Sequence, residues 1–204
     1  MKTGVLGGTF NPPHNGHLAA AKHVREALGL DRVLFIPTNL PPHKKIPEGS
    51  ATAQERCEMV RLMAEPYDWA ELCDIEVRRG GASYTVDTLH ALHDAGYDDL
   101  TLIVGTDMLL SFDVCWRAPE EIARLARLAV VARDVNDQQA LRDKAELLRH
   151  TMNAKISLID APVLPLSSTD VRRIGFFEQM TPPPVAAYIR ENRLYEKFPN
   201  KMTV

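Results

Sequence analysis

The 204-residue sequence lacks the features that mark several large classes of protein. Its cysteines, Cys57, Cys73 and Cys115, form no CxxC pair, so neither a disulfide framework nor a zinc ribbon is indicated. No apolar run approaches the roughly 20 residues of a membrane span, and the N-terminus carries no secretory signal, which predicts a cytoplasmic protein with no membrane partner. Basic residues are not in excess, since the net charge is −3, and this argues against nucleic acid as a partner.

The composition is that of a soluble globular protein. Apolar residues make up 45% of the chain and charged residues 25%. At this length, folding buries about 70% of the surface of the unfolded chain, so a metal or disulfide staple is not needed for stability. The sequence shows no internal repeat, low-complexity segment or long linker, and we expect a single domain over residues 1–204.

Short β-rich runs alternate with amphipathic helical stretches, which predicts an α/β fold with a mainly parallel sheet. The expected strands are residues 3–7, 32–37, 69–77, 100–105, 128–133 and 155–160. The expected helices are residues 18–28, 52–64, 83–95, 119–127, 136–150, one beginning near 170, and 184–192. Thr52 and Glu55 form a capping box, Pro119 suits a first helical turn, and Ser168 or Thr169 is expected to cap the helix near Asp170.

The most unusual segment, GGTFNPPHNGH at residues 7–17, follows the first expected strand, where an open parallel sheet carries its ligands. The chain has neither the GxxxxGK[ST] loop nor the GxGxxG motif, so a nucleotide site must be built differently. Gly7 and Gly8 lack side chains, which lets the backbone N–H groups near Thr9 and Phe10 approach a phosphate closely.

His14 and His17 lie at the start of the helix that follows, where the helix dipole favours an anion. Two imidazoles, a glycine pair and a helix N-terminus together predict a polyphosphate site. The alternative is that both histidines only cap or pack. Metal binding by the pair would need a third ligand, and no nearby residue offers one, so we expect no metal ligands here.

A second candidate phosphate element lies far away in the sequence. SSTDVRR, residues 167–173, places three hydroxyl residues at a helix start and Arg172 one turn inside. Capping explains one hydroxyl, whereas three hydroxyls beside a guanidinium are suited to gripping phosphate oxygens. Ordinary helix capping is the competing interpretation.

Together, GGTFNPPHNGH and SSTDVR resemble the signature pair of the HxGH nucleotidyltransferase superfamily, which implies a Rossmann-like three-layer α/β sandwich. Further motifs resemble those of its bacterial nicotinate-mononucleotide adenylyltransferases: PPHK at 41–44, SYTVDTL at 83–89, GTDMLLSF at 105–112, Trp116-Arg117, and PVAAYIRENRLY at 184–195. The resemblance covers nearly the whole chain except residues 134–160. Leu166 replaces a usual isoleucine, and Lys44 replaces a common arginine, which exchanges a forked donor for a point charge.

The resemblance implies attack of the nicotinate mononucleotide phosphate on the α-phosphorus of ATP, forming deamido-NAD and pyrophosphate. The attacking phosphate is already largely ionised at neutral pH, since its second pKa is about 6, so no general base is needed. Catalysis should come from aligning the phosphates and stabilising the developing charge. Mg²⁺ would arrive mainly on ATP, whose oxygens supply much of its coordination shell.

The resemblance also implies roles for the phosphate-binding residues. His17 would contact the α-phosphate in the transition state, and His14 the phosphates beside it. The backbone from Gly8 to Phe10, with Thr9, would hold the mononucleotide and the bridging phosphate. The β- and γ-phosphates would be held by Lys44, Ser168, Thr169 and Arg172.

Another group of residues is implied to bind the nucleosides. Asp107 follows Gly105 at the end of a central strand and would accept hydrogen bonds from ribose hydroxyls, unless it only caps the next helix. Trp116 would stack on the pyridine ring, although an isolated tryptophan is more often a core residue. The pyridine carboxylate would lie at the helix start formed by Tyr84 and Thr85, which predicts a preference for nicotinate over nicotinamide mononucleotide.

Three other functions compete with this one. Phosphopantetheine adenylyltransferase shares the phosphate machinery, but it typically has threonine in place of His14 and a shorter chain. Glycerol-phosphate or choline-phosphate cytidylyltransferases would carry a different downstream motif. A non-catalytic nucleotide sensor on the same fold commonly loses residues such as His17, Lys44 and Arg172, which are all present here. The sequence leaves open whether the chain forms a homo-oligomer.

Overall fold

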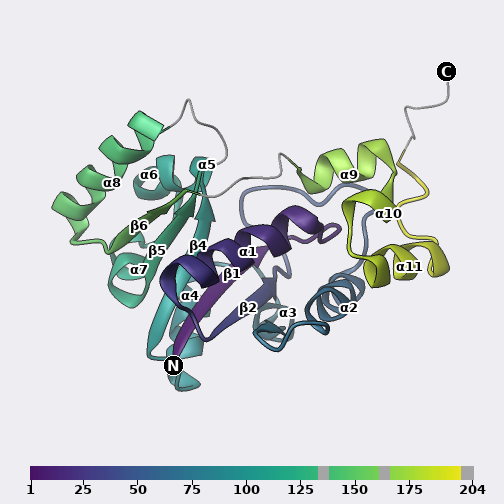
Figure 1. Cartoon of the computed structure of the whole chain (residues 1–204), viewed down its shortest axis with the longest axis horizontal. Helices are drawn as coiled ribbons and strands as arrows, with labels where there is room; N and C mark the ends of the chain where they lie inside the picture. The colour runs from purple at the N-terminus through teal and green to yellow at the C-terminus, as the bar shows by residue number, and fades with distance from the viewer. Residues whose placement is uncertain (133–137, 161–165, 199–204) are drawn as a thin grey trace. The chain divides into compact units, whose positions relative to one another are not determined.

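The computed structural model describes residues 1–132, 138–160 and 166–198. Figure 1 shows the elements along the chain. The strands are β1 (Lys2–Gly8), β2 (Arg32–Pro37), β3 (Ala70–Leu72), β4 (Asp99–Gly105), β5 (Arg127–Val131) and β6 (Ile156–Ile159). The helices are α1 (Asn15–Leu28), α2 (Ala53–Ala64), α3 (Ile75–Arg79), α4 (Thr85–Asp94), α5 (Thr106–Leu110), α6 (Phe112–Cys115), α7 (Pro119–Leu125), α8 (Gln138–Met152), α9 (Ser168–Ile174), α10 (Phe177–Met180) and α11 (Pro183–Glu191).

The strands form one six-stranded sheet in the order β3-β2-β1-β4-β5-β6. β1 pairs with β4, β4 with β5 and β5 with β6, and each of these pairs is parallel. This strand order is that of the Rossmann fold, and it reverses after β1. Ligands of open α/β sheets bind outside the carboxyl ends of the strands at such a reversal, so the segment after β1 is where the topology expects a ligand. The predicted α/β, Rossmann-like fold is confirmed.

The chain divides into two compact units. Unit 1 comprises Met1–Leu6, Ala19–Leu34 and Tyr84–Val163, and unit 2 comprises Gly7–Leu18, Phe35–Ser83 and Leu164–Val204. The expectation of a single domain stays a prediction.

Unit 1 is built on β4, β5 and β6. The side chains of Leu128, Ala129 and Val130 on β5 are completely buried. The helices around these strands contact one another in pairs, α4 with α7 and α5 with α8 (Figure 1). An ion pair of 2.5 Å between Lys144 Nζ and Asp113 Oδ1 joins α8 to α6. Packing is also tight at Gly4, because a Cβ there would lie 3.0 Å from the Leu30 side chain.

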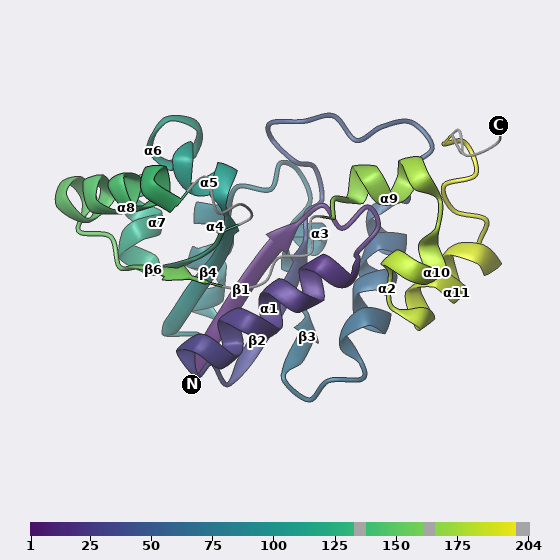
Figure 2. The ribbon, with the colours of Figure 1, turned by 45° about the horizontal axis from the view of Figure 1, so that its top comes forward.

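Unit 2 is largely helical. α2 contacts both α11 and β3, while α10 contacts α9 and α11 (Figure 2). The buried face of α2 carries Met59, Val60 and Met63, which are completely buried. The predicted capping box is confirmed: the Glu55 N–H donates to Thr52 Oγ1 over 3.2 Å, and the Thr52 N–H donates to Glu55 Oε2 over 2.7 Å.

The structure corrects two local predictions. The expected strand over residues 69–77 is wrong beyond Leu72, because residues 75–79 form the helix α3, which a 2.8 Å ion pair between Arg78 Nε and Asp74 Oδ1 supports from one turn to the next. The cap of α9 is Ser167, rather than Ser168 or Thr169, since α9 begins at Ser168. The last residue of one predicted strand, 133, lies outside the described residues, as do the first two residues of the predicted helix that follows, 136 and 137.

Within the described residues, no helix combines the length and apolar character that crossing a membrane requires.

Candidate active site

The loop between β1 and α1 lies in unit 2 and is anchored by Phe10. The Phe10 side chain is 1% exposed and lies edge-on to the rings of Phe35 and His17, with centroid distances of 6.2 and 4.8 Å. Its φ of 49° lies in the left-handed region, which L-residues seldom adopt without support from their surroundings. The buried ring of Phe10 therefore fixes the loop, and only the backbone of this residue is left for the role that the sequence predicts.

The two glycines before this loop differ in their surroundings. A Cβ added at Gly8 would lie 3.3 Å from the Phe10 ring, so packing is tight at this position. A Cβ added at Gly7 would meet no atom within 4 Å among the described residues, and Gly7 is exposed. Packing therefore does not require glycine at position 7. The exposed backbone of Gly7 is accessible to a ligand, which agrees with the prediction that this loop binds phosphate.

His14 and His17 interact closely at the start of α1. Their ring centroids are 3.7 Å apart and the rings are inclined by 31°. The His14 N–H donates to His17 Nδ1 over 3.1 Å, and the His17 N–H donates to the His14 carbonyl over 2.9 Å. His17 thus stands where a capping box usually has glutamate or glutamine. The interpretation that the histidines cap the helix therefore explains the hydrogen bond to Nδ1 of His17 and leaves Nε2 unexplained.

The same geometry fixes the chemistry of the other ring nitrogen. A backbone N–H can only donate, so Nδ1 of His17 must accept, and the neutral ring carries its proton on Nε2. His17 is therefore set up to donate a hydrogen bond from Nε2. The first turn of α1 also contains no acidic residue, so no carboxylate there offsets the positive end of the helix dipole.

The second predicted phosphate element contacts the first one within unit 2. Arg172 is 8% exposed, and its Nη1 donates to the carbonyl of Asn11. Ser168 Oγ donates to the carbonyl of Pro12 over 2.9 Å, across 156 positions of sequence. These two bonds fasten α9 to the loop after β1. Residues 7–17 and 167–173, predicted separately from sequence, therefore form one cluster.

The hydroxyls of α9 already have protein partners. Ser167 Oγ accepts from the Asp170 N–H over 3.1 Å and donates to the Asp170 carboxylate, which lowers the pKa of that carboxyl. Thr169 Oγ1 accepts from Arg172 Nη2 over 3.3 Å. Within the protein, Ser168 and Thr169 thus position the loop and the guanidinium.

Lys44, Arg56 and Arg172 form a group of cations in unit 2. Lys44 lies on an exposed loop, but the surrounding protein partly desolvates its ammonium, which lowers its pKa, and the charges of Arg172 and Arg56 lower it further. Burial also lowers the pKa of both arginines. Cations held this close repel one another, and a polyphosphate would relieve that repulsion.

Sequence reasoning missed Arg56, and it gave no role to Tyr195, which interacts electrostatically with Arg172 and Arg56. Tyr195 is 4% exposed, and burial raises its pKa while the neighbouring Arg172 and Arg56 lower it. Arg56 is 1% exposed and donates to main-chain carbonyls. Arg56 lies in a helix whose pattern looks like ordinary amphipathic sequence. The available signal was its place on the buried face, one position after the capping box, where arginine is rare.

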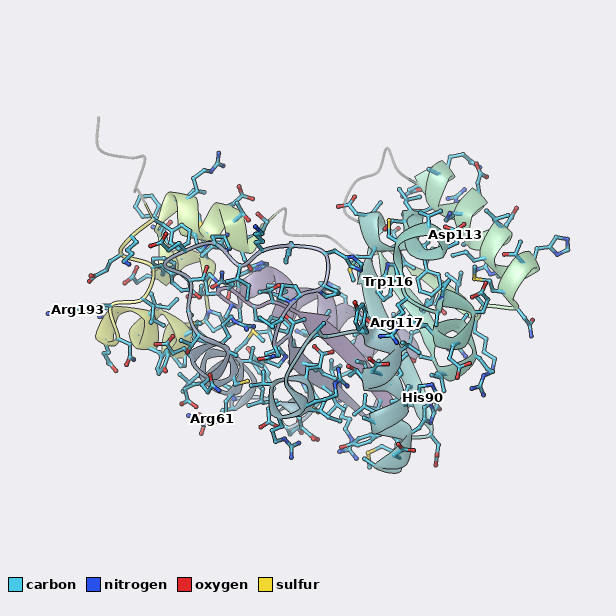
Figure 3. The ribbon with its side chains drawn as sticks, turned by 180° about the vertical axis from the view of Figure 1, so that it is seen from behind. Arg61, His90, Asp113, Trp116, Arg117 and Arg193 are labelled. Atoms are coloured by element: carbon cyan, nitrogen blue, oxygen red, sulfur yellow. The ribbon has the colours of Figure 1, made fainter. Side chains whose placement is uncertain are left out.

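The residues expected to bind the pyridine ring lie in unit 1. Tyr84 caps α4 without a side-chain hydrogen bond to its first turn, and Thr85 is the first helical residue. Arg117 stacks on Tyr84, with its guanidinium carbon 4.6 Å from the ring centroid. Trp116 is half-buried and packs against Phe112 at a centroid distance of 5.2 Å. Figure 3 shows Trp116 and Arg117 next to each other. Because Arg117 stacks on Tyr84, the motif SYTVDTL lies beside the Trp116-Arg117 pair.

Gly105 and Asp107 follow β4, also in unit 1. Gly105 is the N-cap residue of α5, so the interpretation of Asp107 as the cap of this helix is wrong. Asp107 lies in the first helical turn, and its side chain is exposed. An exposed carboxylate at the end of a central strand remains suited to hydrogen bonds from a ribose.

The described residues include no group of three or more His, Cys, Asp or Glu side chains that could hold a metal ion.

Comparisons with known proteins agree with this architecture. The model of the cytidylyltransferase-like family matches residues 5–174. The chain is 42% identical over 198 residues to the probable nicotinate-nucleotide adenylyltransferase of Roseiflexus sp. (strain RS-1), covering 94% of this chain and 96% of the relative. It is 35% identical over 218 residues to the enzyme of the same name from Pelobacter propionicus, covering 98% of this chain and 100% of the relative.

Among solved structures, the fold is similar to that of Plasmodium falciparum nicotinic acid mononucleotide adenylyltransferase complexed with NaAD. The TM-score is 0.75 at 16% identity, and the match covers 98% of this chain and 99% of that one. Because the family match and the sequence relatives each extend over most of the chain, the chain belongs to the cytidylyltransferase-like family and, within it, to the nicotinate-nucleotide adenylyltransferases.

Proposed function

We propose that this chain transfers the adenylyl group of ATP to nicotinate mononucleotide, giving deamido-NAD and pyrophosphate, with the phosphates bound by the cluster around residues 7–17, Lys44 and Arg172. One observation carries the assignment of the site: α9 is fastened to the loop after β1 by Arg172 and Ser168. In the described part of the chain, the hydrogen bonds of Arg172 go to a carbonyl and a hydroxyl rather than to a carboxylate. Its charge is thus left to act on a bound anion.

The mechanism needs alignment and charge stabilisation rather than proton abstraction. An oxygen of the mononucleotide phosphate attacks the α-phosphorus, the bond to the bridging oxygen breaks, and pyrophosphate leaves with the electron pair. His17 donates from Nε2 to a non-bridging oxygen of the α-phosphate as charge builds up there, while His14 lies beside it. Lys44 and Arg172 neutralise the pyrophosphate, and backbone N–H groups of Thr9 and Phe10 hold the incoming phosphate and the bridging phosphate of ATP.

The acceptor is chosen by the residues of unit 1. The N-terminus of α4 at Tyr84 and Thr85 offers backbone N–H groups that favour a carboxylate over a neutral amide. Trp116 provides a flat surface for the pyridine ring, and Asp107 accepts hydrogen bonds from a ribose. Stacking of this kind contributes about 1 kcal/mol beyond area burial.

Mg²⁺ belongs to the same proposal and enters with ATP. The donors of the cluster are imidazole, ammonium, guanidinium and backbone N–H groups, which bind phosphate and not Mg²⁺. The phosphate oxygens would therefore supply much of the shell of the ion, which would add charge neutralisation at the pyrophosphate. The proposal includes a cytoplasmic location, which suits the free thiols of Cys57, Cys73 and Cys115.

Purified protein given ATP, Mg²⁺ and nicotinate mononucleotide is expected to release pyrophosphate and to form deamido-NAD. Nicotinamide mononucleotide should be a poorer acceptor, because a neutral amide gains less from the N-terminus of α4. The measurement is kcat/KM for each acceptor by coupled pyrophosphate detection. Phosphopantetheine serves as the comparison substrate, and equal or faster turnover with it would overturn the proposal.

Binding of ATP is expected to weaken as the pH rises through the lowered pKa of Lys44. Burial and the charges of Arg172 and Arg56 lower this pKa in the unliganded protein, whereas bound phosphates favour the charged ammonium and raise it. Affinity for ATP is therefore complete below the pKa of the unliganded protein and declines above it. The measurement is the KM for ATP from neutral to alkaline pH. Lys44→Arg, which stays charged, should flatten the alkaline rise, and an unchanged profile would contradict this role of Lys44.

A further inference from the structure

Arg56 is an arginine buried in the first two turns of α2, and it connects two loops of unit 2. Its side chain is among the largest that are fully buried, at 1% exposure. Nη1 donates to the carbonyl of Thr9 over 2.7 Å, and Nη2 donates to the carbonyl of Asn39 over 3.2 Å. One guanidinium thus holds both the loop after β1 and the segment that leads to Lys44.

The contact at Thr9 determines the direction of a backbone donor. A trans peptide unit is planar, so the carbonyl of Thr9 and the N–H of Phe10 point to opposite sides. Because the carbonyl points to Arg56, the N–H of Phe10 points away from it. The left-handed φ of 49° at Phe10 is unfavourable for an L-residue and needs surroundings that hold it. Arg56 supplies one such restraint, and packing of the Phe10 ring supplies another.

The contact at Asn39 fixes the start of the second loop. The Asn39 N–H donates to Ser83 Oγ over 2.9 Å, and its side-chain amide donates to the carbonyl of Gly81 over 2.9 Å. The bond from Arg56 completes the restraint on this residue. The chain then continues to Lys44, five positions further on, whose pKa the charge of Arg56 helps to lower.

Burying an arginine is costly, and a well-packed apolar side chain of similar size would often give equal or better stability. The helix start is independently secured by the capping box of Thr52 and Glu55. Asn11 Nδ2 donates to Ser50 Oγ over 2.8 Å, which gives the loop after β1 another attachment beside α2. The charge and forked geometry of Arg56 are therefore more than the fold itself needs at this position.

We infer that Arg56 is a positioning residue for ATP: by gripping the carbonyls of Thr9 and Asn39, it directs the backbone N–H of Phe10 and the Lys44 loop toward the phosphates. This inference rests on the proposed function, because it concerns the same phosphate site. Arg56 itself stays behind the loop, and its effect on the phosphates passes through the groups that it holds.

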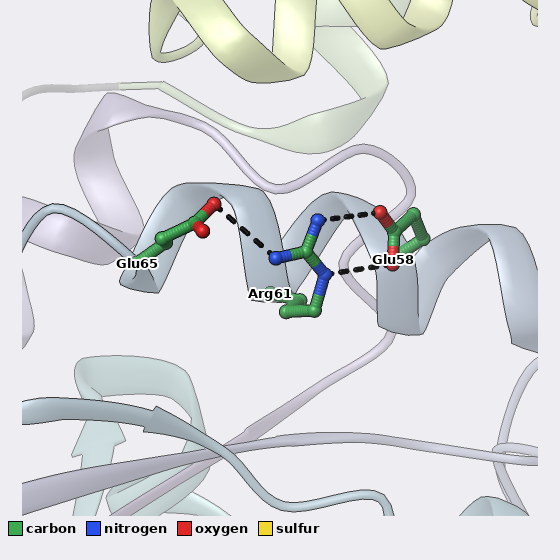
Figure 4. A network of polar contacts seen from close by, with 3 residues as sticks. All are labelled: Glu58, Arg61 and Glu65. Atoms are coloured by element: carbon green, nitrogen blue, oxygen red, sulfur yellow. Dashed lines mark hydrogen bonds and ion pairs between the residues drawn. The ribbon is translucent and has the colours of Figure 1, made fainter.

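The test compares Arg56→Met and Arg56→Lys with Arg61→Met, a control on the same helix. Arg61 is 44% exposed and pairs with Glu58 and Glu65 on the surface of α2 (Figure 4). Calorimetry measures the affinity of each purified variant for ATP and for adenosine, steady-state assays give kcat and KM, and thermal melts report the folded fraction. Adenosine lacks phosphates, so a purely structural defect would lower the affinity for both ligands alike.

Arg56→Met is expected to lower both ATP affinity and kcat by about tenfold or more, with adenosine affinity unchanged within about twofold. Arg56→Lys, which keeps the charge but cannot grip both carbonyls in the same way, should fall between Arg56→Met and wild type. Arg61→Met should match wild type. ATP affinity within about twofold of wild type in folded Arg56→Met, or parallel losses for ATP and adenosine, would overturn the inference.

If Arg56→Met fails to fold, Arg56→Lys decides the question. A loss of ATP affinity of about threefold or more, with adenosine affinity retained, supports the inference, and ATP affinity equal to wild type overturns it. The binding arm needs no acceptor. Wild-type protein that binds ATP but does not use nicotinate mononucleotide would therefore count against the proposed function alone, while the affinities of the variants would still decide the role of Arg56.

Discussion

Replacing His17 with alanine is expected to lower kcat by about 100- to 1,000-fold, the usual effect of removing a preorganised donor to developing charge. Nδ1 of His17 accepts from the His14 N–H, which leaves Nε2 as the proton-bearing nitrogen of the neutral ring. Alanine removes that donor, while the ground-state binding of ATP depends mostly on the cations Lys44 and Arg172. The loss should therefore appear mainly in kcat and less in the KM for ATP. Steady-state pyrophosphate release measures both constants.

His23→Ala provides a matched control on the same helix. His23 is half-buried, and its Nδ1 contacts the carbonyl of Ala19 over 2.7 Å, a local contact within α1. This variant should keep kcat within about threefold of wild type, as surface and helix-side substitutions usually have small effects. A His17→Ala enzyme that is folded and turns over within a few-fold of wild type would show that the Nε2 donor is not used in the transition state.

Arg172→Met is expected to lower kcat/KM for ATP by about 100-fold or more, because charge-assisted bonds to phosphate are among the strongest in proteins. The substitution also removes the bond to the Asn11 carbonyl and the stacking of the guanidinium over the Phe198 ring, whose centroid is 5.0 Å away. It should therefore reduce the melting temperature as well as activity. Arg172→Lys should restore part of the ATP affinity and less of the thermal stability, since it keeps the charge without the fork.

The neighbouring arginine separates the effect of charge from that of position. Arg173 is 62% exposed and pairs with Asp170 over 3.0 Å on the outer side of α9. Arg173→Met removes the same charge from the same helix but none of the contacts with the loop after β1. It should leave kcat and KM close to those of wild type. Equal losses in the two variants would mean that net charge alone, and not the position of Arg172, determines ATP binding.

The main features of fold and site were predictable because each has a local signal. Alternating strand and helix patterns predict a parallel α/β sheet, whereas the order of the strands is a property of the tertiary structure, because doubly wound sheets of different strand order share this pattern. The cluster of residues 7–17 with 167–173 was predictable only as two separate anion sites. Their joining rests on bonds from Arg172 and Ser168 to main-chain carbonyls, and such acceptors are present at every residue, so no sequence pattern marks them.

The two wrong local predictions, the strand beyond Leu72 and the cap of α9, both arose because side-chain contacts outweighed the local sequence pattern. Residues 73–77 contain β-branched side chains suited to a strand, yet the turn at Asp74 and its ion pair with Arg78 start a helix. At α9, three consecutive hydroxyl residues could each serve as the cap, and their other hydrogen bonds decide among them. Ser168 donates to the Pro12 carbonyl, far away in the sequence, and Thr169 accepts from Arg172 on the same helix, which leaves Ser167 to cap. Arg56 carries no signal except its burial.

The attachments of the phosphate loop also affect how this family can change its substrates. Arg56, Arg172 and Ser168 hold the loops through main-chain carbonyls, those of Thr9, Asn39, Asn11 and Pro12. A carbonyl is the same in every residue, so these four bonds do not themselves depend on which side chains the gripped positions carry. Selection can therefore replace those side chains to suit another acceptor while the frame that aligns the phosphates is kept. Adenylyl transfer and choice of acceptor become separately adjustable properties of one fold.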